Sequence, residues 1–218
     1  MKETVFFRSK RNTVLRYGNT VEKRFPSAEA AAVEAGILER LYAAHVRVPN
    51  PVAREGCALI MPYIPGETLP DIFARFENSP EQTDHQSEIR KVADGVINWL
   101  GDFYRAVNAE KTGEIRGDVN GRNFLWDGEY CRGIDFEERV TGAIEQDVGR
   151  LIAFSLTYDP PETPVKKAFA DRLLSGAASA FNVDPAEISK YCEREFAAMR
   201  VRRDSFPAAV SNEKSLSF

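Results

Sequence analysis

The chain has 218 residues, of which 43% are hydrophobic and 28% charged, with a formal net charge of −4. This balance is typical of a globular protein of one or two domains, and the acidic net charge argues against a nucleic-acid-binding protein. The three cysteines are widely spaced without a Cys-x-x-Cys pair, which argues against disulfides or a zinc site and favours a reducing, cytoplasmic setting. We expect no signal peptide and no membrane span, because no apolar run is long enough.

Three short strands are predicted at the start of the chain. They are Thr4–Phe7, Thr13–Tyr17 and Thr20–Phe25. Alternation in the third strand places Val21, Lys23 and Phe25 on one face. A lysine on such an apolar face needs an anionic partner; the alternative is an exposed lysine at a sheet edge.

A helix is predicted next, from its cap at Ser27 to about Ala44. The apolar stripe of this helix is expected to consist of Val33, Ile37, Leu38 and Leu41. Glu34 flanks this stripe, whereas Glu39 falls further from it. If this helix carries a functional carboxylate, Glu34 is the candidate; the alternative is that it is one of several solvated glutamates.

An extended, proline-rich connection over residues 46–52 leads to a buried strand over residues 57–61 and a proline turn. Most of the remaining chain is predicted to be helical. A short helix carries Ile72, Phe73 and Phe76, and the long run from Ile89 to Val107 is expected to be the central core helix. Ser79-Pro80-Glu81-Gln82 resembles a capping box, although Asp84 or Ser87 could serve as the cap instead. Two later helices are expected, over Pro164–Phe181 and from Asp184 onward.

The stretch from Arg116 to Glu137 contains the strongest functional signal. Asp118 is followed after four residues by Asn123, and Asp135 ends a later apolar run. Asp127-Gly128 between two apolar runs predicts a hairpin with a two-residue turn, which brings Asn123 and Asp135 together. An amide oxygen beside a carboxylate suits Mg²⁺, and Asp118 could accept the proton of an attacking hydroxyl. The alternative is that these residues only serve turn chemistry.

Asp-x-x-x-x-Asn followed by Ile-Asp-Phe resembles the catalytic loop and metal-binding aspartate of kinases. Gly117 before Asp118, and Glu137 after Asp-Phe, are closer to the aminoglycoside phosphotransferase and choline kinase branch. Arg116 departs from that pattern, because it occupies the position of a family histidine. The resemblance extends from about Thr4 to Leu156.

The resemblance implies roles for several further residues. Lys23 would hold nucleotide phosphates and pair with Glu34, and Asp147 would brace the catalytic loop. Ser9 and Asn12, in a glycine-free loop, could contact phosphate, although a solvated basic turn is the alternative there. Met61, Pro62 and Ile64 lie in the segment that would contact adenine. As metal ligands, the resemblance implies Asn123 and Asp135; as catalytic base, it implies Asp118.

The implied fold is α+β and bilobal, of the protein-kinase-like type. Its N-terminal lobe of sheet and helix would span residues 1–65, its mainly helical C-terminal lobe residues 66–204, and a tail residues 205–218. No feature of the sequence specifies an oligomeric state.

The implied activity is transfer of the γ-phosphate of ATP, with Mg²⁺, to a hydroxyl of a small molecule. The short interval between Asp135 and Asp147 favours such an acceptor, because a docking surface for a peptide substrate would need a longer segment. Two alternatives remain: a compact atypical kinase resembling the RIO kinases, which phosphorylates proteins, and a nucleotide-binding regulatory module without transfer activity.

Overall fold

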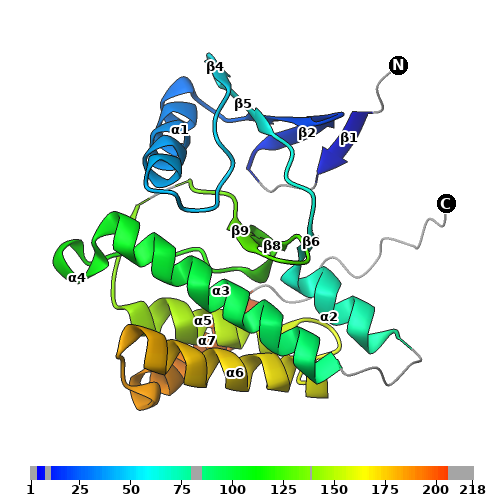
Figure 1. Ribbon diagram of the computed structural model, residues 1–218, viewed down its shortest axis with the longest axis vertical. Helices are drawn as coiled ribbons and strands as arrows, with labels where there is room; N and C mark the ends of the chain where they lie inside the picture. The colour runs from blue at the N-terminus through cyan, green and yellow to red at the C-terminus, as the bar shows by residue number, and fades with distance from the viewer. Residues whose placement is uncertain (1–3, 8–10, 80–84, 138, 206–218) are drawn as a thin grey trace.

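The computed structural model describes residues 4–7, 11–79, 85–137 and 139–205. A five-stranded antiparallel sheet and helix α1 form the upper part in Figure 1, and the other helices form the lower part. The hairpin of β8 and β9 lies between the two parts. This arrangement confirms the α+β class and the division into a sheet-containing lobe and a helical lobe.

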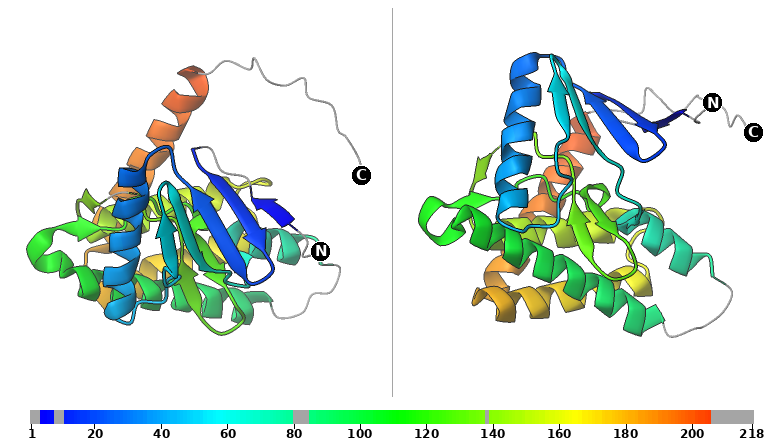
Figure 2. Two further views of the ribbon diagram at one scale, coloured as in Figure 1. Left: turned by 90° about the horizontal axis from the view of Figure 1, so that it is seen from above. Right: turned by 45° about the horizontal axis from the view of Figure 1, so that its top comes forward.

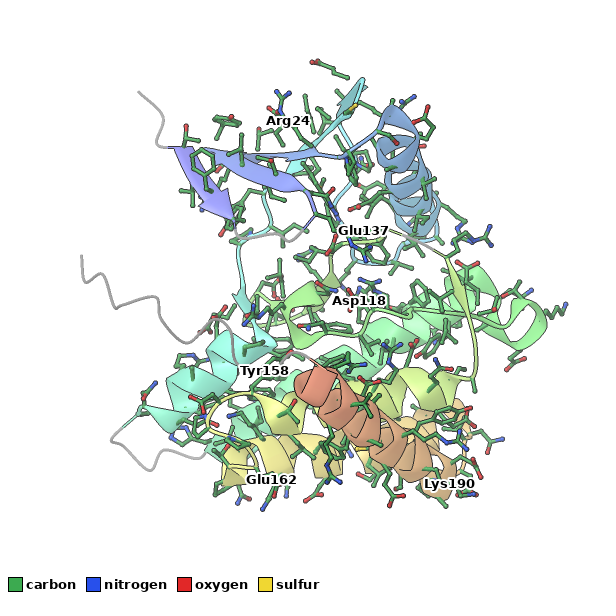
Figure 3. The ribbon with its side chains drawn as sticks, turned by 180° about the vertical axis from the view of Figure 1, so that it is seen from behind. Arg24, Asp118, Glu137, Tyr158, Glu162 and Lys190 are labelled. Carbon is green, nitrogen blue, oxygen red and sulfur yellow. The ribbon has the colours of Figure 1, made fainter. Side chains whose placement is uncertain are left out.

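The N-terminal sheet has the strand order β1-β2-β3-β5-β4. Its strands are β1 (Thr4–Phe7), β2 (Thr13–Tyr17), β3 (Thr20–Arg24), β4 (Ala53–Glu55) and β5 (Ala58–Pro62). All neighbouring strands are antiparallel, and Lys23 is opposite Val14 on one side and Leu59 on the other. Lys23 therefore lies on a central strand and is buried, whereas Arg24 is exposed and points to the outside of the sheet (Figure 3).

Helix α1 (Ala28–Ala43) begins at Ser27, whose side chain accepts a hydrogen bond from the amide of Ala30. The predicted apolar stripe is wrong in one position, because Val33 is 48% exposed. The buried face instead runs through Ala31, Glu34, Leu38 and Leu41, which follow one another at helical spacing. Glu34 thus lies on the buried stripe itself.

The chain passes from the N-terminal sheet to a second, three-stranded sheet between Pro62 and Glu67. β5 pairs within the N-terminal sheet, whereas β6 (Glu67–Thr68) pairs with β8 (Phe124–Trp126), which in turn pairs with β9 (Cys131–Gly133). The predicted hairpin is confirmed, but its two-residue turn is wrong. The loop has four residues, because the Asp127 carboxylate accepts hydrogen bonds from the amides of Glu129 and Tyr130 and keeps Tyr130 out of the strand.

The longer helices other than α1, within the described ranges, lie together below the sheet in the right-hand view of Figure 2. They are α2 (Leu69–Glu77), α3 (His85–Val107), α5 (Ile144–Thr157), α6 (Pro164–Phe181) and α7 (Pro185–Ser205). The predicted central helix α3 is confirmed, with fully buried Val92, Val96 and Leu100 on its inner face. The predicted capping box at Ser79 falls largely on residues outside the described ranges, as does Asp84.

Short elements complete the connections. They are α4 (Ala109–Thr112), β7 (Glu114–Ile115), the 3-10 turn η1 (Gly121–Asn123) and β10 (Val140–Thr141). β10 pairs with β7, so the segment after Asp135 is fixed to the strand that precedes the catalytic loop. No helix in the described part of the chain has both the length and the apolar character that a membrane crossing requires.

Candidate active site

Lys23 joins the two parts of the molecule through its ammonium group. It forms an ion pair of 2.6 Å with Glu34 of α1 and another with Asp135, beyond β9. The side chains of Lys23 and Glu34 are nearly inaccessible, at 7% and 2%, whereas that of Asp135 is 36% exposed. Glu34 is therefore the buried partner, and Asp135 is the partner that faces solvent.

Burial by itself would lower the pKa of Lys23, because water stabilises an ammonium better than a protein interior does. Glu34 and then Asp135 outweigh this effect by charge attraction and hydrogen bonding, so the pKa of Lys23 is raised above its usual value. Lys23 therefore carries a full positive charge at physiological pH. A buried cation of this kind suits the binding of an anionic group such as a phosphate.

The candidate catalytic loop, called the catalytic loop from here on, comprises residues 116–123, and its second part contains two successive side-chain turns. The Asp118 carboxylate accepts a hydrogen bond of 3.2 Å from the amide of Asn120, and the Asn120 side chain accepts one of 3.0 Å from the amide of Arg122. Asp118 is exposed at the surface of the loop. Its Oδ2 atom forms no hydrogen bond with any described residue, so one carboxylate oxygen remains available to a substrate.

The structure brings Asn123 next to the hairpin end that leads to Asp135. The amide of Ile134 donates to the Asn123 carbonyl at 3.0 Å, and Asn123 Nδ2 donates to the Asp118 carbonyl at 3.3 Å. Asp135 itself has φ +67°, a left-handed conformation that an aspartate tolerates better than most residues. Asp118, Asn123 and Asp135 thus belong to one connected backbone network.

The side-chain oxygens of Asn123 and Asp135 are the candidate ligands for Mg²⁺. Asp135 offers an accessible carboxylate. The side-chain nitrogen of Asn123 is used in the bond to the Asp118 carbonyl, so its side-chain oxygen points the other way. No group of three or more His, Cys, Asp or Glu side chains within the described ranges is placed to hold a metal ion. The residues fit Mg²⁺ in its usual form, with one or two protein ligands completed by phosphate oxygens and water.

Asp147 of α5 supports the catalytic loop from below. Its carboxylate accepts hydrogen bonds from the amides of Arg116 and Gly117, at 2.7 and 2.9 Å, and from the Tyr104 hydroxyl at 3.0 Å. The side chain is completely buried. Burial raises the pKa of Asp147 despite these three donors. Asp147 therefore has the bracing contacts that the resemblance implied.

Arg116 stands at the position where the family that the sequence resembles has a histidine. Its guanidinium donates to the carbonyls of Ile134 and Asp135, at 2.7 Å each, and lies 4.2 Å from the centre of the Phe136 ring. Arg116 is buried, and burial lowers its pKa, opposed by Asp118 and Asp147. The arginine thereby fixes the backbone on which Asp135 is placed, which the sequence alone did not indicate.

Glu137 contacts the two residues that precede strand β2. Its carboxylate accepts hydrogen bonds from Asn12 at 2.6 Å and from Arg11 at 3.3 Å, and it lies 3.9 Å from Lys23. Asn12, expected to contact phosphate, is thus close to the Lys23 cluster, which consists of Lys23, Glu34, Asp135 and Glu137. Ser9, for which the same role was expected, lies outside the described residues.

The segment expected to contact adenine follows β5. Met61 is buried and paired with Val21, Pro62 is exposed at the end of the strand, and Ile64 is half-buried. The amide of Tyr63 donates to the Asn19 carbonyl, so this segment is attached to the turn between β2 and β3. The adenine contacts themselves stay a prediction.

Two positions at the site were not found from the sequence. Tyr158, after the end of α5, contacts the catalytic loop through its hydroxyl group. Glu137 was noted only as a departure from the kinase pattern. In Figure 3, Asp118 and Glu137 lie at the level between the sheet and the helices, and Tyr158 lies on the helical side. No local sequence pattern marks Tyr158, because its role depends on a contact between distant segments.

A small antiparallel sheet with one helix, a helical lobe, and a Lys–Glu–Asp cluster beside an Asp-x-x-x-x-Asn loop together define the protein-kinase-like class. The sequence matches the RIO domain over residues 4–153. Because this match spans more than half of the chain, the protein belongs to the RIO domain family. A comparison with curated proteins finds no matching sequence.

A comparison with solved structures finds similar chains. The ADP-bound aminoglycoside phosphotransferase APH(2'')-Ib has a TM-score of 0.59 and 14% identity, over 97% of this chain and 88% of that one. The aminoglycoside phosphotransferase APH(3'')-Id from Streptomyces rimosus has a TM-score of 0.51 and 14% identity, over 86% and 90%. A choline/ethanolamine kinase family protein from Mesorhizobium loti has a TM-score of 0.45 and 16% identity, over 91% and 87%. At these identities the first two show a common fold.

Proposed function

We propose that this protein is a phosphotransferase that uses ATP and Mg²⁺ to phosphorylate a hydroxyl group of a small molecule. The observation that carries the proposal is the position of the Lys23 ammonium, which bonds both Glu34 and Asp135 across the junction of the two lobes. A buried cation, an accessible metal-type carboxylate and a neighbouring exposed Asp118 are the groups that phosphoryl transfer requires.

In the proposed reaction, Lys23 binds phosphate oxygens of ATP while Glu34 holds the lysine in place. Asn123 and Asp135 would hold Mg²⁺, which neutralises charge on the phosphates when it is bound. The acceptor oxygen forms a bond to the γ-phosphorus as the bond from this phosphorus to the bridging oxygen of ADP breaks. The Oδ2 atom of Asp118 takes the proton of the acceptor hydroxyl, which balances the step.

A small acceptor is supported by the segment that follows Asp135. This segment is held against the core by the β10–β7 pair and by ion pairs from Arg139 and Arg40 to the buried Glu114, both at 2.5 Å. α5 begins shortly afterwards, at Ile144. A segment so short and so firmly attached offers little extended surface for a peptide, which favours a compact acceptor.

A cavity lies in the helical lobe near the end of α5, and we propose it as a candidate for the acceptor site, although Asp118 is not among its lining residues. Its volume is about 460 Å³, and its lining includes Leu156, Asp159, Phe196 and Arg200 from the end of α5 and from α7. Tyr158, which bonds the catalytic loop, immediately precedes Asp159. A mixed apolar and charged lining of this size is typical of sites for small polar molecules.

The second candidate function is phosphorylation of serine or threonine in a protein. The match to the RIO domain favours it, because the resemblance to RIO kinases implies a protein acceptor. The two candidates share the nucleotide site and differ only in the acceptor. They are therefore separable by the identity of the phosphorylated product.

The test begins with binding of ATP to the purified protein, with and without Mg²⁺, by calorimetry. We expect binding that strengthens with Mg²⁺. The protein is then incubated with radiolabelled ATP and a panel of amino alcohols, sugars and nucleosides, and in parallel with a protein mixture. A labelled small molecule supports the first candidate, and labelled serine or threonine supports the second. Binding without any labelled product or released ADP would contradict both.

A further inference from the structure

Tyr158 connects the catalytic loop to the end of α5. Its hydroxyl accepts a hydrogen bond of 2.9 Å from the amide of Gly121 and donates one of 2.9 Å to the Oδ1 atom of Asn120. The residue lies at the C-cap of α5 with an extended backbone, which turns its side chain out of the helix direction. Tyr158 also lies beyond the range that matches the RIO domain.

The surroundings of Tyr158 hold its hydroxyl in this position. The ring packs near Phe73 of α2, with 6.4 Å between ring centroids. Burial raises the pKa of Tyr158 to about 12, so the hydroxyl keeps its proton and can donate at any ordinary pH. Gly121 permits the close approach, because a Cβ atom there would lie 3.0 Å from the tyrosine oxygen.

The contacts form a chain that ends at the proposed base. The Tyr158 hydroxyl donates a hydrogen bond to the Asn120 side chain. The backbone amide of the same asparagine donates to Oδ1 of Asp118. The Asn120 side chain also accepts from the amide of Arg122, so it fixes the loop on both sides of Gly121. With Oδ1 of Asp118 held, Oδ2 remains to face the acceptor. A small rotation of Asn120 would therefore turn the Asp118 carboxylate.

We propose that Tyr158 is a positioning residue for phosphoryl transfer, which sets the orientation of Asp118 by holding Asn120 and Gly121. This inference rests on the proposed function, since it assigns Tyr158 a part in the reaction of that same site. Tyr158 touches neither substrate, and it acts through Asn120. Loss of its hydroxyl should therefore slow the transfer step and leave nucleotide binding intact.

The test compares Tyr158→Phe with Tyr191→Phe in the full chain. The Tyr191 hydroxyl forms no hydrogen bond with a described residue, so its loss controls for removal of a phenolic oxygen. ADP formed from ATP and Mg²⁺ is measured with the best acceptor of the panel, or with water alone. We expect kcat of Tyr158→Phe to fall about tenfold or more while KM for ATP stays within about twofold. Equal kcat in the two variants would overturn the inference.

A double-mutant cycle distinguishes positioning from general destabilisation. Because Tyr158 holds both Asn120 and Gly121, the loss of kcat in Asn120→Ala combined with Tyr158→Phe should be clearly smaller than the product of the two single losses. Losses of kcat that multiply would contradict this coupling. Gly121→Ala is a second way to displace the tyrosine, and it should slow kcat in the same manner if Tyr158→Phe fails to fold.

Hydrogen exchange gives a measurement that does not depend on turnover. The Gly121 amide should exchange faster in Tyr158→Phe than in wild type, whereas Tyr191→Phe should leave it unchanged. Absence of turnover in wild type would contradict the proposed function itself. Normal turnover in Tyr158→Phe, or an unchanged Gly121 amide, would instead overturn only the role of Tyr158.

Discussion

The Lys23 cluster and the catalytic loop lie side by side but are held in place by different forces. Lys23 is fixed by charged side chains, Glu34 and Asp135, from two other segments. The loop is fixed by hydrogen bonds between its backbone and the buried side chain of Asp147, and by the Tyr158 hydroxyl. The Lys23 ammonium can exchange one carboxylate partner for a bound anion, because charge attraction depends little on direction. Backbone hydrogen bonds are directional, so they fix the conformation of the loop.

This difference suits the two proposed roles, which are nucleotide binding for the Lys23 cluster and proton acceptance by Asp118 for the loop. Three carboxylates, those of Glu34, Asp135 and Glu137, lie around the Lys23 ammonium, and Arg11 pairs with Glu137, so the cluster consists of ion pairs that a cation–phosphate complex could rearrange. The loop needs one fixed direction for a carboxylate oxygen. We therefore expect substitutions in the cluster to change binding, and substitutions in the loop to change turnover or folding.

The largest effect is expected for Asp118→Asn. Because an amide cannot accept the proton of the attacking hydroxyl, kcat should fall by about 10²- to 10⁴-fold. Affinity for ATP with Mg²⁺, measured by calorimetry, should stay nearly the same. Asp171→Asn, at an exposed position of α6, is the matched control and should keep wild-type turnover. Retained turnover in Asp118→Asn would remove Asp118 from its proposed role.

The next effect is on folding, for Asp147→Ala. The change leaves two buried backbone amides and the Tyr104 hydroxyl without an acceptor, so the free energy of unfolding should fall by about 3 kcal/mol. Urea denaturation measures this change. Tyr104→Phe removes only one of the three bonds and should cost about 1 kcal/mol. Equal losses in the two variants would show that Asp147 does not brace the loop.

A smaller effect is expected for Lys23→Met on nucleotide binding. Loss of a charged hydrogen bond to phosphate should weaken ATP binding by about 2 kcal/mol, measured by calorimetry. Arg24→Met is the control, because Arg24 is the next residue of the same strand and points outward (Figure 3). Glu34→Gln should weaken binding less than Lys23→Met, since it only loosens the lysine. A stronger loss for Arg24→Met would contradict the assigned face of β3.

The smallest effect is a pH dependence at Glu114. Burial raises the pKa of Glu114, but the hydrogen bonds of Arg40 and Arg139 outweigh it and hold the pKa below its usual value. The glutamate therefore stabilises the fold above the unfolded pKa of about 4.3, and this contribution is lost as pH falls through the lower folded pKa. The free energy of unfolding of wild type should exceed that of Glu114→Gln by about 1 kcal/mol at pH 7. This difference in stability should become smaller toward pH 3. A constant difference would contradict this assignment.

Much of the local structure was predictable from sequence patterns. The helical period over Ile89–Val107 and the strand alternation around Lys23 depend only on which residues are apolar, and both predictions are confirmed. The stripe of α1 was displaced because Val33 is apolar yet exposed, whereas Glu34 is charged yet buried. A polarity pattern cannot anticipate a buried charge whose partner, Lys23, comes from another element.

The site was predictable where spacing carries the chemistry. Asp118, Asn123 and Asp135 were selected because one loop and one hairpin join them, and short connections constrain distance. Arg116 and Tyr158 could not be selected in this way. Their partners are the carbonyls of Ile134 and Asp135 and the amide of Gly121, which are backbone atoms that any residue would supply.

The sequence by itself determined the α+β composition and the order of the elements, and it indicated the residues that we propose for phosphoryl transfer. These properties follow from local periodicity and from the chemistry of individual side chains. Only the tertiary structure decided how the residues are held: Lys23 between two carboxylates, Asp135 on a backbone fixed by Arg116, and Asp118 at the end of a chain of hydrogen bonds from Tyr158. Such contacts join segments far apart in the chain, and their geometry depends on how the helices and the sheet pack together.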